Sequence, residues 1–241
     1  MSMTTFPKIL RHVALCRNAV SYSTSTEQTR NQLCALLRET AQPVAVVTSF
    51  MPSSRSNNDR ARYHGATLSS FTSIAMDPHP LVSFSLRHPS RMAQSLKSAH
   101  PNLPAHMVVN LLSAAQTSTA VKFSRPDIYP EPFSTVPYLL SEEGLPMLSG
   151  SLGAVSCKLV STPLPLHDLE LSENKMVQRG ENVATPVGNS VASELFIARV
   201  IRVENLTVEE EEEDSSRTLP LLYHRRGFTS CHTVHRSEVE S

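Results

Sequence analysis

The 241-residue sequence has no net charge, little glycine and no long apolar run. Lys+Arg and Asp+Glu are equal at 22 each. This balance argues against a general nucleic-acid-binding protein, because such proteins use a basic excess to displace counterions. No apolar run reaches the roughly 20 residues that a membrane-spanning helix needs. We therefore expect no membrane span and no nucleic-acid partner.

Several chemical motifs are also missing. The four cysteines (Cys16, Cys34, Cys157 and Cys231) form no CxxC pair and no other metal-ligand spacing. Neither a metal site nor a disulfide framework is therefore predicted. The sequence contains no GxGxxG, GxxxxGK[ST] or GxSxG motif. These absences exclude a Rossmann dinucleotide fold, a P-loop and the nucleophile elbow of α/β-hydrolases.

The N-terminal residues differ in composition from the rest of the chain. Residues 1–26 contain Lys8, Arg11 and Arg17 among apolar residues, then a Ser/Thr-rich run, and no acidic residue. A basic, hydroxyl-rich and acid-free start is typical of a mitochondrial transit peptide. A frayed terminus is the alternative interpretation. We expect a protein of the mitochondrial matrix, with the cytoplasm as the alternative.

The remaining pattern predicts a mainly β protein. With 17 Pro against 7 Gly, and many Val, Leu, Ser and Thr, the chain favours short strands and turns. Helices are predicted over residues 27–40, 89–99 and 113–123. The predicted strands cover residues 43–50, 65–76, 80–86, 107–112, 154–161 and 193–203, with a closing strand and turn over 219–228.

This irregular order favours an antiparallel barrel with appended helices over a doubly wound sheet. We expect one domain over residues 27–230. Polar insertions are predicted near 52–63, 172–192 and 205–217, and a polar tail over 231–241.

Residues 65–92 are the most informative stretch. Hydroxyl side chains gather at Thr67, Ser69, Ser70, Thr72 and Ser73. Ser90 and Arg91 then open a predicted helix, where free N–H groups and the helix dipole favour an anion. Such a surface suits a phosphorylated, partly aromatic ligand. A Ser/Thr-rich edge strand followed by a capped helix is the alternative.

Five segments, in chain order over about residues 40–228, resemble the flavin reductase-like family of FMN-binding split barrels. They are GATLSSFTSIAMDPHPLVSF (65–84), VVNLLSAAQTSTAVKFS (108–124), the stretch 142–157, SELFIARV (193–200) and PLLYHRRGF (220–228). The resemblance implies an FMN-binding split β-barrel of antiparallel, Greek-key-like topology. Together with the N-terminal composition it points to a fungal-type mitochondrial member.

The resemblance also implies where the flavin lies. The residues expected along the flavin are Thr67, Leu68, Ser69, Ser70 and Ser73. Ser85, Leu86 and Arg87 would offer backbone to the ring edge, and Ser90 and Arg91 would hold the phosphate. Asn110 and Phe123 would shape the pocket wall. The implied ligands are FMN, with FAD as the alternative, and NAD(P)H as co-substrate. The implied protein partners are a second copy of the chain and an oxygenase.

Two positions depart from the family pattern. Many members carry Gly-Asp-His before the L-F-I strand, and this chain has Ser193 at the position of that histidine. His167, beside Asp168, is the candidate displaced counterpart with a catalytic role, and a surface or core-edge histidine is the alternative. The family's Gly-Glu is Ala198-Arg199 here. Two hypotheses follow: a reductase that transfers hydride from NAD(P)H to flavin or another acceptor, and a non-catalytic FMN-binding or interaction protein.

Overall fold

The computed structural model describes residues 26–51, 62–166, 193–204 and 216–231. The chain divides into two compact units, residues 1–37 and 38–241. Helix α1 (Thr26–Arg38) makes up nearly all that is described of the first unit. Its bounds match the predicted helix 27–40, and Leu33, Leu36 and Leu37 are exposed on it. Among the described residues, no helix is long and apolar enough to cross a membrane.

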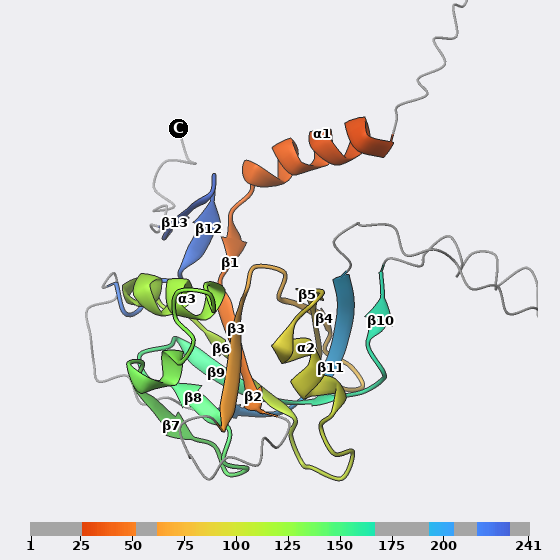
Figure 1. Cartoon of the computed structure of the whole chain (residues 1–241), viewed down its shortest axis with the longest axis vertical. Coiled ribbons are helices and arrows are strands. Elements are labelled where there is room, and N and C mark those ends of the chain that lie inside the picture. The colour runs from red at the N-terminus through yellow and green to blue at the C-terminus, as the bar shows by residue number, and fades with distance from the viewer. Residues whose placement is uncertain (1–25, 52–61, 167–192, 205–215, 232–241) are drawn as a thin grey trace, which may run out of the picture. The chain divides into compact units, whose positions relative to one another are not determined.

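The second unit is built on an eight-stranded antiparallel sheet (Figure 1). Its strands are β2 (Ala45–Phe50), β3 (Tyr63–Leu68), β4 (Thr72–Ala75), β5 (Leu81–Arg87), β6 (Met107–Leu111), β9 (Gly153–Leu159), β10 (Leu164–Pro165) and β11 (Ser193–Glu204). They are ordered β3-β2-β6-β9-β11-β5-β4, with β10 paired to β11. The predicted mainly β, antiparallel split-barrel fold is confirmed.

Smaller elements complete the unit. The helices are α2 (Arg91–Lys97) and α3 (Thr117–Ser124), and the 3₁₀ turns are η2 (Ala114–Gln116) and η3 (Pro132–Ser134). A three-stranded sheet joins β1 (Gln42–Pro43), β12 (Leu222–His224) and β13 (Gly227–Thr229). A hairpin pairs β7 (Tyr138–Leu140) with β8 (Pro146–Leu148).

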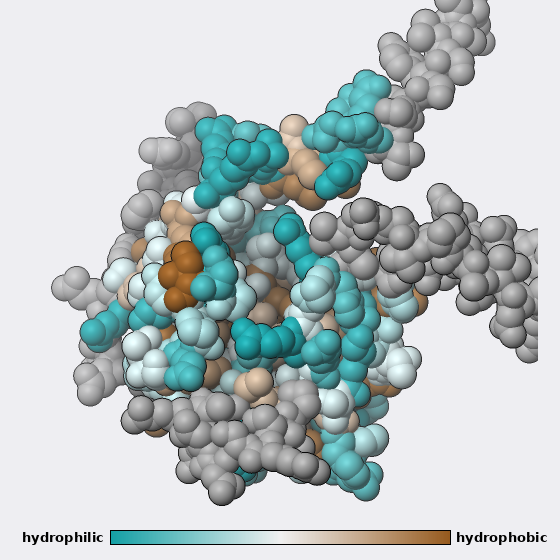
Figure 2. Space-filling view, in the orientation of Figure 1, coloured by the Kyte–Doolittle hydropathy of each residue, from teal (hydrophilic) through white to brown (hydrophobic). Residues whose placement is uncertain are grey.

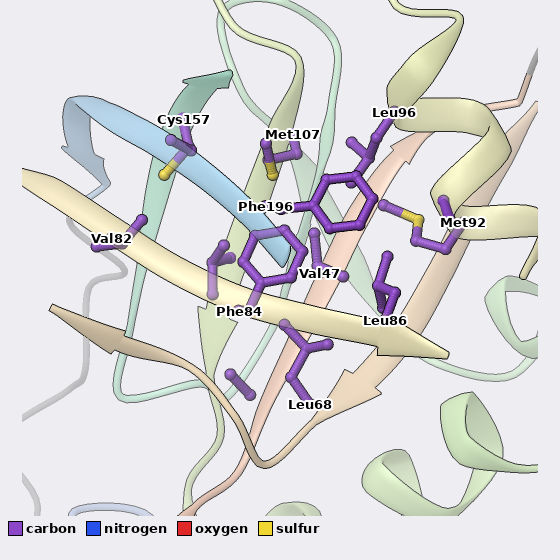
Figure 3. Close-up of a cluster of buried hydrophobic side chains, with 14 residues drawn as sticks. Val47, Leu68, Val82, Phe84, Leu86, Met92, Leu96, Met107, Cys157 and Phe196 are labelled. Atoms are coloured by element: carbon purple, nitrogen blue, oxygen red, sulfur yellow. The ribbon is translucent and has the colours of Figure 1, made fainter. Parts of the chain in front are cut away.

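The core lies inside the curl of the sheet, where α2 packs against the strands (Figures 1 and 3). Phe84 of β5 and Phe196 of β11 are register partners, and their rings stack with centroids 5.4 Å apart. Met92 and Leu96 of α2 are buried in the same cluster. Burying each such side chain stabilises the fold by about 1.5–3 kcal/mol. The helix that follows the hydroxyl-rich stretch is therefore fixed by the core.

The prediction of one strand over residues 65–76 is wrong. The structure places two strands there, β3 and β4, at opposite edges of the sheet. Ser69–Phe71 lie between them as irregular backbone, and the side chain of Ser70 bonds to the backbone of β5. Period-two alternation continues through the break, so it does not reveal that the chain changes partner strands.

Other predictions need smaller corrections. The helix predicted over 113–123 begins as η2, after a capping box between Ser113 and Gln116. The Pro-rich region 125–146 contains strand β7 and the start of β8, which were not predicted. The closing strand is a hairpin, β12–β13, that also pairs with β1. His167, the stretch 172–192 and the acidic run 209–214 lie outside the described residues.

Candidate flavin site

Thr67 and Leu68 end β3, and Ser69 and Ser70 begin the turn that follows it. The hydroxyl of Thr67 donates to the Ala120 carbonyl of α3 at 2.7 Å, which ties the end of β3 to this helix. Leu68 is buried in the core, while Ser69 and Ser70 are exposed. The turn is therefore anchored by Thr67 and Leu68 and presents two hydroxyl side chains to solvent.

Ser70 joins this turn to the end of β5. The Ser85 backbone N–H donates to Ser70 Oγ at 3.0 Å, and Ser70 Oγ lies 3.3 Å from the Ser85 carbonyl. Beyond Ser85, Leu86 is buried and Arg87 is exposed. Two segments that were predicted to face one flavin, 67–70 and 85–87, are thus brought together. Ser73 is exposed on β4, which pairs with β5.

Ser90 is the N-cap of α2. Its side chain accepts a hydrogen bond from the Ala93 N–H at 3.2 Å, as the capping alternative predicts. Arg91 is exposed. The cap uses a lone pair of the hydroxyl, so its O–H donor and the first N–H groups of the helix remain for an anion. Cap and anion site are therefore compatible at this position.

Asn110 and Phe123 are buried. The amide of Asn110 donates to the Val46 carbonyl at 3.1 Å and accepts from the Leu148 N–H at 2.8 Å. Phe123 packs on Gly65, where an added Cβ would lie 2.6 Å from the Phe123 ring. These contacts explain why the Asn110 and Phe123 side chains are buried in the interior next to the turn. Their predicted role as pocket wall stays a prediction.

A cavity of about 400 Å³ lies beside the turn. Thr67, Leu68 and Ser69 of the predicted site line it. Its other lining residues come from β1–β2, the end of α3 and the β12–β13 hairpin: Val44, Val121, Ser124, Arg125, Tyr223, Arg226 and Phe228. The sequence interpretation assigned no role to these residues, although PLLYHRRGF was one of the matching segments.

In the part of the chain that the structure describes, the cavity lining contains two arginines and no acidic residue. Arg125 is held by Asp127, with its Nε and Nη2 at 3.1 and 2.9 Å from the two carboxylate oxygens. Figure 2 shows that the face drawn is mainly hydrophilic, with apolar residues in small separate areas. Hydroxyl groups, arginines and the rings of Tyr223 and Phe228 fit an anionic ligand with a planar ring.

A second cavity of about 340 Å³ shares no residue with the predicted site. It is lined by the end of β2, Arg62 and the segment that follows α2. Arg62 precedes β3 while Thr67 to Ser69 lie at the other end of that strand, about 17 Å away at strand rise. The two cavities are therefore separate.

Two titratable groups near the site have shifted pKa values. Burial, and then the charge of Arg91, lower the pKa of His64 to about 4. Burial alone would raise the pKa of Glu194, but hydrogen bonds from Lys97 and His88 outweigh it, and the net direction is down. Lys97 Nζ and His88 Nε2 lie 2.8 and 3.0 Å from Glu194 Oε1. Glu194 thus connects the start of β11 to both ends of the segment that contains Ser90 and Arg91.

The two departures from the family pattern are both on β11. Ser193 is half-buried at the start of the strand, opposite Arg87 of β5, and Arg199 is exposed. Within the described ranges no group of three or more His, Cys, Asp or Glu side chains could hold a metal ion. A flavin at the predicted site would need no catalytic side chain for hydride transfer, because its ring carries out redox steps itself.

Comparison with known proteins identifies relatives. Residues 37–232 match the family model described as "Flavin reductase like domain". The chain is 30% identical to the NADH-dependent flavin reductase StyB of Pseudomonas fluorescens over 159 residues, which cover 65% of this chain and 84% of that protein.

Solved structures share the fold. Nitrilotriacetate monooxygenase component B from Mycobacterium thermoresistibile matches with a TM-score of 0.58 and 18% identity, over 90% of this chain and 98% of that chain. The NADH:FAD oxidoreductase SgcE6 of Streptomyces globisporus, in complex with NAD and FAD fragments, matches with a TM-score of 0.54 and 22% identity, over 83% of this chain and 91% of that chain. The protein belongs to the flavin reductase-like domain family.

Proposed function

We propose that the protein binds FMN and transfers a hydride from NAD(P)H to flavin or to a downstream acceptor. The observation that supports the proposal is the hydrogen bond between Ser85 and Ser70, which joins two segments that we predict to contact the flavin, beside a cavity. The reductase names of StyB and SgcE6 support the reaction class. FAD is the alternative flavin, since SgcE6 is named for it.

The residues of this chain would bind and orient. Thr67 and Leu68 hold the turn against α3 and the core, so that Ser69 and Ser70 face the ligand. The backbone at Ser85 to Arg87 is fixed by its ladder with β11 and can offer N–H and C=O groups to the ring edge. Ser90 and Arg91 would hold the phosphate. When bound, the flavin accepts the hydride from the reduced nicotinamide.

The second candidate is a non-catalytic FMN-binding or interaction protein on the same barrel. Ser193 and Arg199 favour it, because they replace the family's histidine and glutamate. His167 is proposed as the displaced counterpart and lies outside the described residues. An anaerobic titration of the FMN-loaded protein with NADH and with NADPH separates the candidates. Loss of the flavin colour supports the reductase, and persistent colour with both nucleotides supports the second candidate.

We further propose a homodimer, an oxygenase partner and a mitochondrial location. The first two are expected from the family, and the name of nitrilotriacetate monooxygenase component B fits a two-component system. The composition of residues 1–26 supports the location, with the cytoplasm as the alternative. A monomeric mass in light scattering would contradict the dimer. An intact Met1 in protein from isolated mitochondria would contradict cleavage around residues 21–27.

A further inference from the structure

The turn of the β12–β13 hairpin has an unusual composition. Arg225 and Arg226 join His224 to Gly227, which are register partners, and their φ angles are +48° and +67°. A two-residue hairpin turn with both φ angles positive favours Asn, Asp and Gly. A side chain with a Cβ is strained in this left-handed region. Two arginines here therefore destabilise the hairpin relative to glycine.

Contacts within the fold explain Arg225. Its Nε lies 2.9 Å from the Glu39 carboxylate, and its backbone N–H donates to the Arg38 carbonyl at 3.1 Å. The ion pair joins the turn to the segment that leads into β1. Arg225 thus has a partner in the folded protein, although an exposed ion pair of this kind stabilises only weakly.

No such contact accounts for Arg226. Within the described part of the chain its guanidinium makes no ion pair and no hydrogen bond, and it lines the 400 Å³ cavity. Arg125, the other cavity arginine, is neutralised by Asp127 at 2.9 Å. Among the described lining residues, which include no acid, Arg226 therefore supplies the positive charge that has no counterion. Strained residues without a structural partner are found at ligand-binding sites.

We propose that Arg226 binds a phosphate group of the nicotinamide dinucleotide, which enters the cavity beside the flavin. The inference rests on the proposed function. Thr67, Leu68 and Ser69 belong both to the cavity and to the proposed flavin edge, so a ligand in the cavity lies next to the ring. The proposed flavin phosphate subsite, Ser90 and Arg91, is not part of the cavity.

The cavity chemistry suits part of a dinucleotide. Tyr223 and Phe228, with ring centroids 5.6 Å apart, and the side chains of Val44 and Val121 form apolar wall for a planar ring. An arginine fork binds phosphate oxygens with charge-assisted hydrogen bonds. The volume lies within the roughly 300–1,000 Å³ of small-molecule sites.

The test compares Arg226→Gly with the matched control Arg225→Gly. Both relieve backbone strain in the left-handed region. The first removes a cavity charge, and the second instead removes the ion pair with Glu39 and leaves the cavity lining intact. Calorimetric titration of the FMN-loaded protein with NAD⁺ and NADP⁺ measures binding without turnover. We expect Arg226→Gly to weaken binding by about tenfold or more, the range for a hydrogen bond to a charged group. Its Tm should be unchanged or higher, and its Kd for FMN should stay within about twofold of wild type. Arg226→Lys should retain part of the affinity.

The outcomes separate this inference from the proposed function. If Arg226→Gly weakens the binding of both nucleotides, Arg226 contacts the pyrophosphate. If it weakens the binding of NADP⁺ alone, Arg226 contacts the 2′-phosphate. Unchanged binding by Arg226→Gly, or equal weakening by both glycine variants, overturns the inference. A wild-type protein that takes up no flavin contradicts the proposed function instead.

Discussion

At the residue level, Gly65 fixes how closely β3 approaches α3. A Cβ at this position would lie 2.6 Å from two atoms of the buried Phe123 ring. Overpacking of this kind destabilises a fold by about 1–3 kcal/mol. We expect Gly65→Ala to lower the free energy of unfolding in urea by that amount. The control is Gly153→Ala on β9, where an added Cβ has no atom within 4 Å. Equal effects of the two variants would contradict this interpretation.

His64, the neighbour of Gly65, makes stability depend on pH. Its folded pKa of about 4 is below the ordinary value of 6.5, so the unfolded chain binds the proton more tightly. The contribution to stability is therefore complete above pH 6.5 and is lost as the pH falls from 6.5 to 4. Its upper limit is about 3 kcal/mol, at 1.36 kcal/mol per pKa unit.

His64→Gln should reduce the loss of unfolding free energy between pH 7.5 and pH 5. A residual loss is expected, because burial, and then the charge of Lys158, also lower the pKa of His106. Urea unfolding at the two pH values measures the difference. The same loss in variant and wild type would assign the acid sensitivity to other groups.

At the level of elements, Glu194 links β11 to the segment from His88 to Lys97 that carries the proposed phosphate residues. Its carboxylate is buried, and Oε2 has no hydrogen-bond partner among the described residues. Lys97 and His88 are partly exposed, so removing the carboxylate leaves no charge buried without water. The link is therefore better suited to positioning this segment than to stabilising the fold.

We expect Glu194→Gln to weaken FMN binding more than riboflavin binding, because the loosened segment contacts the phosphate. Fluorescence titration with the two flavins measures both affinities. Glu204→Gln is the control, because Glu204 is a carboxylate on the same strand that bonds Arg202 at 2.8 Å. It lies ten residues from Glu194, or roughly 33 Å at strand rise. Equal weakening of FMN and riboflavin would show that Glu194 does not act through the phosphate.

Some elements could be predicted from the sequence and others could not. The sequence predicted the strands that have a buried face, such as β5 and β11, and the helix that contains Met92 and Leu96. Burial of one face produces regular apolar spacing in both kinds of element. The break between β3 and β4 was not predicted. At the break, the Ser85 N–H bonds to the side chain of Ser70 and not to a strand backbone, and the alternation of residue types in the sequence continues unchanged. The role of the hydroxyl side chains at 67–73 in flavin binding stays a prediction. Arg226 was missed because the strain in its turn depends on φ angles, which the sequence pattern does not give.

At the level of the whole molecule, the open seam of the barrel accounts for the position of the site. β3 and β4 end the order of the sheet, and the chain crosses from one to the other through Ser69–Phe71. Ser70 meets Ser85 of β5 there. Backbone groups that leave the strand ladder at such a seam are available to a ligand. The fold thus places the turn after β3, the end of β5 and the cavity at this seam.

We propose that this seam holds a flavin that is reduced by nicotinamide nucleotide. The most direct measurement is the visible spectrum of purified protein after loading with FMN and gel filtration, followed by anaerobic addition of NADH or NADPH. We expect a yellow protein that retains FMN and loses its colour with at least one of the two nucleotides. A colourless protein that retains neither FMN nor FAD would contradict this proposal.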